Sequence, residues 1–190
     1  MTKILFSVIA LLVFASAGYA PPTRATTLAR MSLAELARAA DTIVQVRCVS
    51  AASRWDSGTI WTFTEFEVVE TLKGAPQQRI SVRVPGGHVG HLAATIEAAP
   101  QFRPGEESVL FLEKTNAGDY SVTAWAEGTF RIRRVPGMGR AAVTQESNRF
   151  AVFDQATRRF HAEGVRDLSL DEFRQRLTAA MAQPASGISR

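Results

Sequence analysis

The chain has 190 residues, a formal net charge of +4 and a hydrophobic content of 46%. This size and hydrophobic content fit one folded domain with a substantial core, which excludes a disordered or low-complexity chain. Cys48 is the only cysteine, so no intrachain disulfide can form and stability must come from packing. We expect Cys48 itself to be a small buried residue of that core.

The first residues are typical of a secretory signal peptide. Lys3 gives a positive start, and Ile4 to Phe14 form an apolar run that is too short to span a bilayer. We place the signal peptide at 1–17, with cleavage after Ala17 and Ala20 as the competing site. An uncleaved membrane anchor is the less favoured alternative. The sequence therefore predicts a secreted or periplasmic protein with no transmembrane segment after cleavage.

A short helix and two strands are predicted next. Ser32-Leu33-Ala34-Glu35 is a capping-box pattern, which favours an amphipathic helix ending near Ala40. The β-branched residues of Ile43–Ala51 predict a first strand. After a turn at Asp56-Ser57-Gly58, Ile60–Leu72 is the longest strand candidate.

The long second strand has two distinct faces. Thr62, Thr64, Phe66 and Val68 share one face, and Trp61, Phe63, Glu65 and Glu67 share the other. The carboxylates mark the second face as the wetter one. Val69 and Leu72 break the alternation, which indicates a β-bulge.

The remaining elements follow in chain order. Ile80–Val84 alternates as a third strand, and a glycine-rich loop is expected at Gly86–Gly90. The apolar run Val109–Leu112 predicts a strand buried on both faces. A further strand is expected from Tyr120 to Trp125.

The C-terminal part is expected to add a hairpin and a helix. Phe130 and Ile132 alternate with arginines, and Phe150–Phe153 is the predicted partner strand of that hairpin. Ser169-Leu170-Asp171-Glu172 is a second capping-box pattern. It predicts a helix whose apolar face carries Leu170, Phe173, Leu177 and Met181. We expect one domain over 30–182 and a disordered tail at 183–190.

This order of elements is typical of a five-stranded OB-type β-barrel, here with a short N-terminal helix, an extra C-terminal hairpin and a C-terminal amphipathic helix. Four features carry a closer likeness: Ala40-Asp41 before the first strand, Thr62-Phe63-Thr64-Glu65-Phe66 in the second, Leu72-Lys73-Gly74 at its end, and Gly105 before Val109–Leu112. Residues 40–126 resemble the netrin-like modules of tissue inhibitors of metalloproteinases, and also secreted bacterial proteins built on the same frame.

The best-known activity of those inhibitors does not carry over to this chain. Their N-terminal cysteine chelates the protease zinc through its amine and carbonyl groups and is held by disulfides. Here the mature end is expected at Gly18 or Pro21, and no disulfide is possible. No inhibitory residue can be assigned from the resemblance.

Positive charge is concentrated in one region. Residues 128–166 carry eight basic and three acidic side chains, whereas residues 18–127 carry ten and twelve. The basic side chains of interest are Arg131, Arg133, Arg134, Arg140, Arg149, Arg158 and Arg159. Export makes nucleic acid an improbable partner, so an anionic polymer of the cell envelope or an unknown protein is the expected one. A solvated surface without a ligand is the simpler alternative.

An aromatic cluster is the second candidate binding site. Trp55, Trp61 and Phe63 gather around the first turn and the second strand, where OB barrels commonly bind extended polymers on aromatic faces. We favour the alternative that the C-terminal helix or the 128–153 hairpin covers these rings, because that helix has an apolar face to bury.

Catalytic and metal-binding signals are weak. His88 and His91 form the only histidine pair, with Glu97 as the best guess for a further ligand, and they are weak candidates for a metal site. Glu106-Glu107 is expected to be part of a turn, since adjacent strand residues point to opposite faces. The chain has no GxSxG, HExxH, P-loop or Rossmann motif.

We therefore expect a non-enzymatic, exported binding module without a cofactor. The candidate ligand-binding residues are Trp55, Trp61, Phe63, Arg131, Arg133 and Arg134. A protease inhibitor acting through barrel loops is the main alternative, and a metal-dependent enzyme using His88 and His91 is a distant one.

Overall fold

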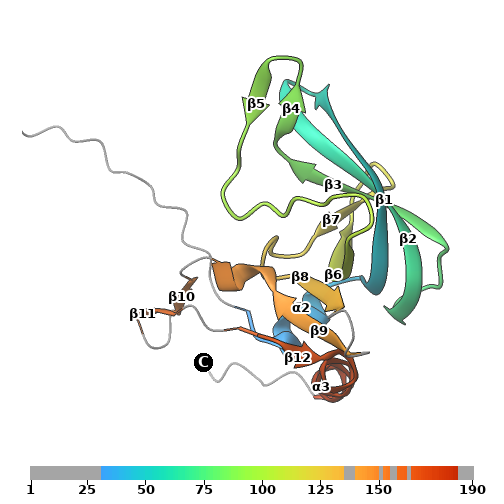
Figure 1. The fold of residues 1–190 in the computed structure, drawn as a ribbon, viewed down its shortest axis with the longest axis vertical. Coiled ribbons are helices and arrows are strands. Elements are labelled where there is room, and N and C mark those ends of the chain that lie inside the picture. Colours follow the sequence, from blue (N-terminus) through green and yellow to red (C-terminus); the bar gives the residue numbers. More distant parts are fainter. Residues whose placement is uncertain (1–30, 135–139, 150–151, 155–157, 162–163, 184–190) are drawn as a thin grey trace, which may run out of the picture.

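The computed structural model describes residues 31–134, 140–149, 152–154, 158–161 and 164–183 (Figure 1). The expected signal peptide and nearly all of the expected tail lie outside these residues. The described chain is mainly β. Its strands are β1 (Thr42–Asp56), β2 (Thr59–Lys73), β3 (Arg79–Pro85), β4 (Gly87–Val89), β5 (Leu92–Ala94), β6 (Glu107–Lys114), β7 (Tyr120–Val122), β8 (Thr129–Arg134), β9 (Ala141–Gln145), β10 (Val152–Asp154), β11 (Arg159–His161) and β12 (Leu168–Ser169). The helices are α2 (Leu33–Ala39), the 3-10 turn η1 (Glu146–Arg149) and α3 (Leu170–Ala182).

One large sheet organises the molecule. Its strand order is β1-β2-β3-β7-β6-β8-β9-β12, and β1 also pairs with β6. That additional pairing joins β1, β2, β3, β7 and β6 into a ring of hydrogen-bonded neighbours, which we call the closed sheet. All pairings within it are antiparallel except that of β3 with β7.

The hairpin of β1 and β2 is longer than expected from the sequence. Instead of ending at Ala51, β1 continues to Asp56, where a two-residue turn leads into β2. Ser57 and Gly58 adopt φ angles of 51° and 80°, which fit the twist of a tight hairpin. The predicted bulge is confirmed, because the register skips Val69 between its neighbours in β2.

Two hydrophobic clusters lie on opposite faces of β1 and β6. The interior of the closed sheet holds Val44, Val46, Phe66, Leu110 and Leu112, among others. The second cluster takes the alternate residues of the same strands, namely Ile43, Val109 and Phe111, and packs them against helix residues such as Leu36 and Phe173. The prediction that Val109–Leu112 is buried on both faces is therefore confirmed. Cys48 is buried in the first cluster, also as predicted.

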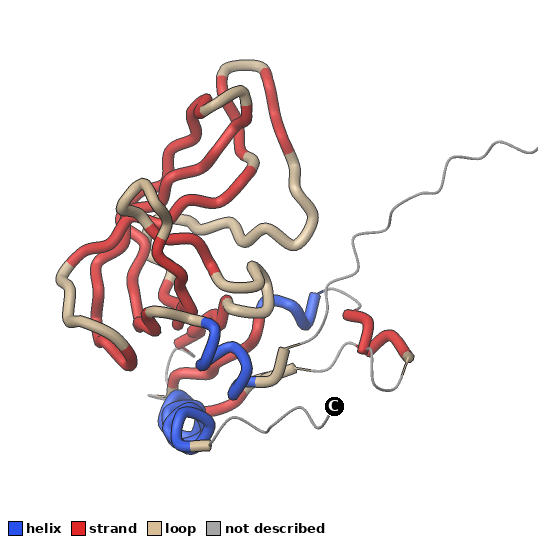
Figure 2. Tube along the Cα trace, turned by 180° about the vertical axis from the view of Figure 1, so that it is seen from behind, coloured by secondary structure: helices blue, strands red, loops and turns tan. Residues whose placement is uncertain are grey.

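Strands β8, β9 and β12 extend the sheet beyond β6; α3 packs on β9 and β12, and α2 packs on α3 and β6 (Figure 2). Ser32 and Glu35 form the predicted capping box of α2. At α3 the Ser169 hydroxyl accepts a hydrogen bond from the Glu172 amide. Met181 is 38% exposed rather than part of the packed face of α3; Ala180 is buried in that turn instead.

Two expectations about the strands are wrong. The partner of β8 is β9, with Ile132 opposite Val143, rather than Phe150–Phe153; within that segment β10 pairs with β11 instead, and Phe150 lies outside the described residues. β7 ends at Val122, because Ala124 and Trp125 adopt left-handed φ angles of 49° and 50°.

The glycine-rich loop also differs from expectation. It contains the short hairpin of β4 and β5, which folds back beside the β1–β2 turn (Figure 1). Gly87 permits this close approach, since a Cβ atom there would lie 2.2 Å from the Ser53 hydroxyl.

Candidate functional site

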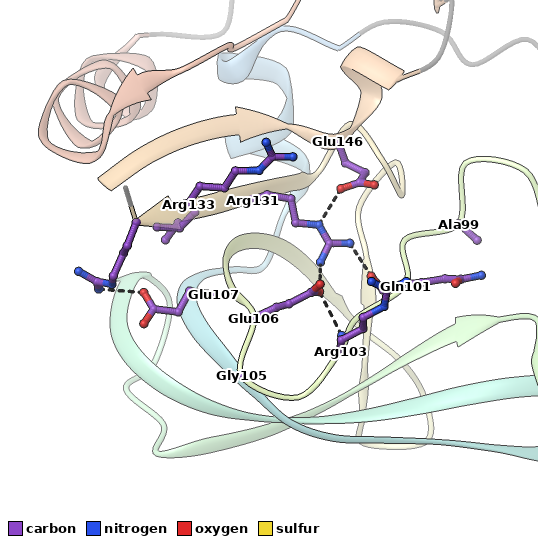
Figure 3. A pocket seen from close by; sticks show the side chains of 11 residues that line it. Ala99, Gln101, Arg103, Gly105, Glu106, Glu107, Arg131, Arg133 and Glu146 are labelled. Carbon is purple, nitrogen blue, oxygen red and sulfur yellow. Dashed lines mark hydrogen bonds and ion pairs between the residues drawn. The ribbon is translucent and has the colours of Figure 1, made fainter. Parts of the chain in front are cut away.

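A cavity lies between the sheet extension and the segment that leads into β6 (Figure 3). It has a volume of about 590 Å³. Its charged lining residues are Arg103, Arg131, Arg133, Arg134, Glu106, Glu107 and Glu146. We call it the arginine cleft. Strand β8 supplies three of the four arginines, and the turn before β6 supplies Arg103.

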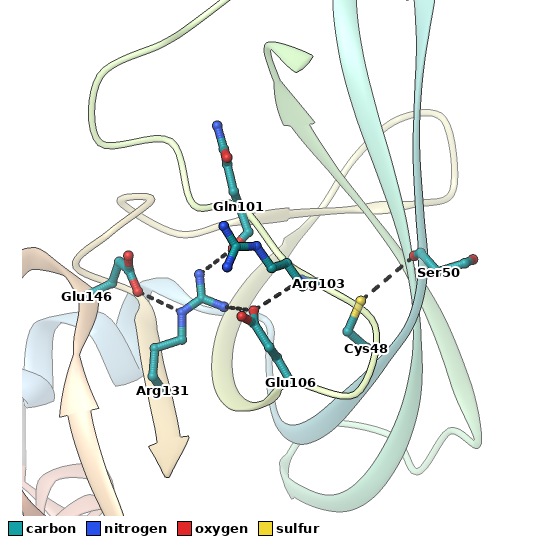
Figure 4. Close-up of polar contacts among 7 residues, drawn as sticks. All are labelled: Cys48, Ser50, Gln101, Arg103, Glu106, Arg131 and Glu146. Atoms are coloured by element: carbon teal, nitrogen blue, oxygen red, sulfur yellow. Dashed lines mark hydrogen bonds and ion pairs between the residues drawn. The ribbon is translucent and has the colours of Figure 1, made fainter. Parts of the chain in front are cut away.

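Arg131 joins the two walls of the arginine cleft (Figure 4). Its Nε donates to Glu146 at 2.6 Å, and its Nη1 donates to Glu106 at 3.0 Å. Its Nη2 donates to the carbonyl oxygen of Gln101 at 2.5 Å, and the guanidinium lies 4.7 Å from the ring centre of Phe102. Because its donors are engaged on three sides, Arg131 fixes the shape of the cleft.

Arg134 is also paired, through Glu107. The Glu107 carboxylate accepts hydrogen bonds from Arg134 and Arg47, each at 2.8 Å. Burial by itself raises the pKa of Glu107, but the two arginine hydrogen bonds outweigh it and hold the pKa below its ordinary value. Glu107 is therefore ionised at neutral pH and neutralises part of the charge of these arginines.

Two guanidinium groups remain available for a ligand. The side chains of Arg103 and Arg133 are exposed, and neither has an ion-pair or hydrogen-bond partner within the part of the chain that the structure describes. Both line the arginine cleft. A guanidinium presents a planar fork of donors that matches a carboxylate, so this arrangement can bind anions.

Glu106 and Glu107 act separately. Glu106 accepts from Arg131 and from the Arg103 amide, whereas Glu107 pairs with Arg47 and Arg134. Glu106 closes the turn that begins at Arg103, as expected, whereas Glu107 is already the first residue of β6. Nearby, burial and the Glu106 carboxylate raise the pKa of the Cys48 thiol, which stays protonated and contacts the carbonyl oxygen of Ser50 (Figure 4).

The three aromatic candidates lie elsewhere, at the far part of the β1–β2 hairpin. Trp55 is 52% exposed beside the turn. The guanidinium of Arg54 lies 3.7 Å from the ring centre of Phe63, and Arg83 lies 5.4 Å from that of Trp61. These arginines, rather than helix α3, lie over the rings, because α3 packs its buried face on α2, β9 and β12.

The two histidines are exposed and lie on the β4–β5 hairpin. The backbone amide of His88 donates to the Ser53 hydroxyl at 3.2 Å. His91 occupies the turn, and Glu97 is exposed after β5. Among the described residues no group of three or more His, Cys, Asp or Glu side chains could hold a metal ion.

The sequence alone identified only some of the residues that line the arginine cleft. Arg131, Arg133 and Arg134 were candidates, and the structure places all three at the cleft. Arg103 and Gln101 were missed. They lie about 30 positions earlier in the chain, and no local pattern relates that segment to β8.

Neither a comparison with models of known protein families nor one with curated proteins found a match to this chain. None of the helices in the described residues has the length and apolar character needed to cross a membrane.

Proposed function

We propose that this chain is an exported, non-enzymatic binding module that recognises carboxylate-bearing partners through the arginine cleft. The observation that carries the proposal is a pair of guanidinium groups, Arg103 and Arg133, that have no partner among the described residues and lie at a cavity of about 590 Å³. The other two arginines of the cleft are held by glutamates, so they shape the cleft instead of competing for the ligand.

The scaffold that we propose is an OB-like barrel of the netrin type. The ring order of the closed sheet supports it: first, second, third, fifth and fourth strands, with the fourth returning to the first. A partly open Greek-key barrel of five strands has this character. Helix α2 lies before β1, as expected from the order of elements that indicated the resemblance to netrin-like modules.

The charge pattern of the cleft favours a chain of carboxylates over a single small anion. The two available guanidinium groups approach from different walls, one from the turn before β6 and one from β8. A polymer that places successive carboxylates along the cleft can engage both, and exposed charge pairs of this kind are weakened by salt.

Binding of two defined polymers tests the proposal. Poly-L-glutamate and polygalacturonate carry the same carboxylates on a protein and on a sugar chain, and neutral dextran is the control ligand. We expect the double variant Arg103→Gln/Arg133→Gln to lose about tenfold in affinity, and wild-type binding to weaken between about 0.02 and 0.3 M salt. The preferred polymer identifies the class of partner.

A matched variant separates the arginine cleft from net charge. Arg38→Gln/Arg79→Gln removes two exposed arginines outside the cleft and changes the net charge equally. Equal loss in both double variants, or wild-type binding that ignores salt, would contradict the proposal.

One observation favours a second candidate function, protease inhibition through loops. The β1–β2 turn and the β4–β5 hairpin lie side by side at one end of the molecule (Figure 1). Trp55 and Leu92 are exposed there, and Ile96 is exposed just after β5. A panel of purified proteases, assayed with wild type and with the Trp55→Ala/Leu92→Ala variant, tests this function. Inhibition that the double variant retains in full would exclude these hairpins.

A further inference from the structure

The two edges of β1 are not equally paired along its length. Up to Arg47, β1 lies between β2 on one side and β6 on the other. Cys48 makes the last contacts on the β6 side: its amide donates to Glu106, and its carbonyl oxygen accepts from Gly105, both at 2.9 Å. From Val49 to Trp55 the strand keeps only β2, and no described residue offers a backbone partner on the other edge.

The path of the chain before β6 explains this open edge. Gly105 adopts a φ angle of 86°, and the preceding segment turns away from β1 there instead of extending β6. The open edge, Val49–Trp55, carries neither proline nor lysine, the residues that commonly protect exposed edges. Val49 is 48% exposed and Trp55 is 52% exposed, so the edge is accessible.

The direction of the unpaired backbone groups follows from the hairpin register. Asp56 and Thr59 flank the two-residue turn and form its closing hydrogen-bonded pair. Hydrogen-bonded pairs then alternate along the ladder, so Ala51, Ser53 and Trp55 direct their N–H and C=O groups away from β2. Three residues therefore present donors and acceptors at the open edge.

A second cavity lies beside this open edge. Its volume is about 170 Å³, and Ala51, Ser53, Thr62, Thr64, Gln101 and Phe102 are among its lining residues. Ser53 and Thr62 pair their hydroxyls at 2.9 Å. Thr64 is fully buried, and its Oγ1 has no hydrogen-bond partner among the described residues. A buried hydroxyl without a partner is unfavourable, and a ligand atom in the cavity would satisfy it.

We propose that the open edge of β1 binds an extended peptide segment of a partner protein, and that one short hydrogen-bonding side chain of that segment, such as Ser, Thr or Asn, enters the cavity beside Thr64. The added strand would continue the sheet where β6 leaves it. Main-chain hydrogen bonds to Ala51, Ser53 and Trp55 would supply affinity, and the cavity would supply specificity.

A peptide fits this site better than a second copy of the chain. In an edge-to-edge dimer the side chains of this edge that lie beside the cavity are Ala51 and Ser53, which line the cavity of their own copy. Both are too short to reach across to Thr64 of the other copy. The cavity would then stay empty in such a dimer, and Thr64 Oγ1 would stay unpaired.

Selection from a displayed library of random linear peptides, about seven residues long to match the open edge, tests the proposal. The purified full chain is the target and the Ala51→Pro variant is the counter-target. Proline at position 51 removes an edge N–H that β2 does not use, so the β1–β2 ladder survives. Trp55→Pro has the same effect at the other end of the edge and serves if Ala51→Pro does not fold.

We expect peptides that bind wild type and lose at least about tenfold in affinity for either proline variant. Their sequences should share a Ser, Thr or Asn at one position, and Thr64→Val should weaken binding by a similar factor. Ala52→Ser is the control, because it keeps every backbone N–H and its side chain lies on the outer face, opposite Phe63.

Three results would overturn the proposal: no peptide that distinguishes wild type from both proline variants, binding that Thr64→Val leaves unchanged, or concentration-dependent dimers that Ala51→Pro abolishes. The Arg103→Gln/Arg133→Gln variant should bind the selected peptides as wild type does. The two proposed sites can therefore fail independently.

Discussion

The two halves of the β1–β2 hairpin use the same strands for different purposes. In the half from Thr42 to Cys48, β1 has neighbours on both edges, and its inward side chains pack with those of β6. In the half from Val49 to Asp56, one edge of β1 is open and the interior contains a cavity. The first half provides stability, and the second half leaves hydrogen-bonding groups available.

The interior side chains change character at the same point. Along β2, Phe66 and Val68 face the apolar core, but Thr64 and Thr62 continue the same inward face as hydroxyls. The inward face of β2 is therefore apolar where the sheet is closed and polar where the edge of β1 is open. Four measurements test this contrast.

The largest effect is expected from Phe66→Ala. Phe66 is 1% exposed, and its ring meets that of Phe102 edge-on at 5.0 Å. Removing a buried aromatic ring leaves a cavity, so we expect the free energy of unfolding to fall by about 3–5 kcal/mol. Urea unfolding measures it. Phe63→Ala, on the outer face under Arg54, should cost only about 1 kcal/mol. Similar losses in both variants would remove the distinction between the faces.

Arg131→Met should have the next largest effect. The substitution removes the cation that joins Glu146, Glu106 and the Gln101 carbonyl. Since the side chain of Arg131 is only 16% exposed, we expect a loss of about 2–3 kcal/mol in the free energy of unfolding.

Arg133→Met is the matched control for Arg131→Met. It removes an exposed arginine of the same strand and should change stability by less than about 0.5 kcal/mol. Differential scanning calorimetry compares the two variants. An Arg133 effect as large as that of Arg131 would show that both arginines are structural, and the proposed anion site would lose its available guanidinium.

Acidification should produce a smaller loss at the place where β6 leaves β1. The folded pKa of Glu107 lies below its ordinary value, so its contribution to stability is complete above the unfolded pKa and is lost as the pH falls through the folded pKa. Unfolding measured from neutral to acidic pH should show this loss in wild type. In Glu107→Gln the loss should be smaller, and an identical pH profile would contradict the assignment.

The regular elements were predictable because their signals are local. Ser32 with Glu35 forms the capping box that begins α2, and Val109–Leu112 is continuously apolar because it faces two cores. The β4–β5 hairpin was not predictable, since each of its strands is only three residues long and they lie in a segment that reads as a glycine-rich loop. Nor was β9, whose Ala141–Gln145 sequence carries a weak strand signal.

The candidate sites were predictable only where their residues are neighbours in sequence. The arginines of β8 form a visible cluster, but their approach to Arg103 depends on the path of a long connection. Likewise, an open edge is a property of what lies beside a strand. The sequence of Val49–Trp55 predicts part of a strand, and only the turn at Gly105 shows that β6 does not accompany it.

The smallest stability effect, Thr64→Val, tests the contrast most directly. Valine has nearly the shape of threonine without its hydroxyl, and the Thr64 hydroxyl has no partner among the described residues. We therefore expect the free energy of unfolding to stay within about 1 kcal/mol of wild type, with an increase as the favoured direction. Urea unfolding beside Phe66→Ala measures it. A stabilised variant would mean that Thr64 is retained at the expense of stability, which is expected where a binding site must stay available. A loss above about 2 kcal/mol would instead make the hydroxyl part of the fold, because it would then have to be satisfied within the cavity by ordered water.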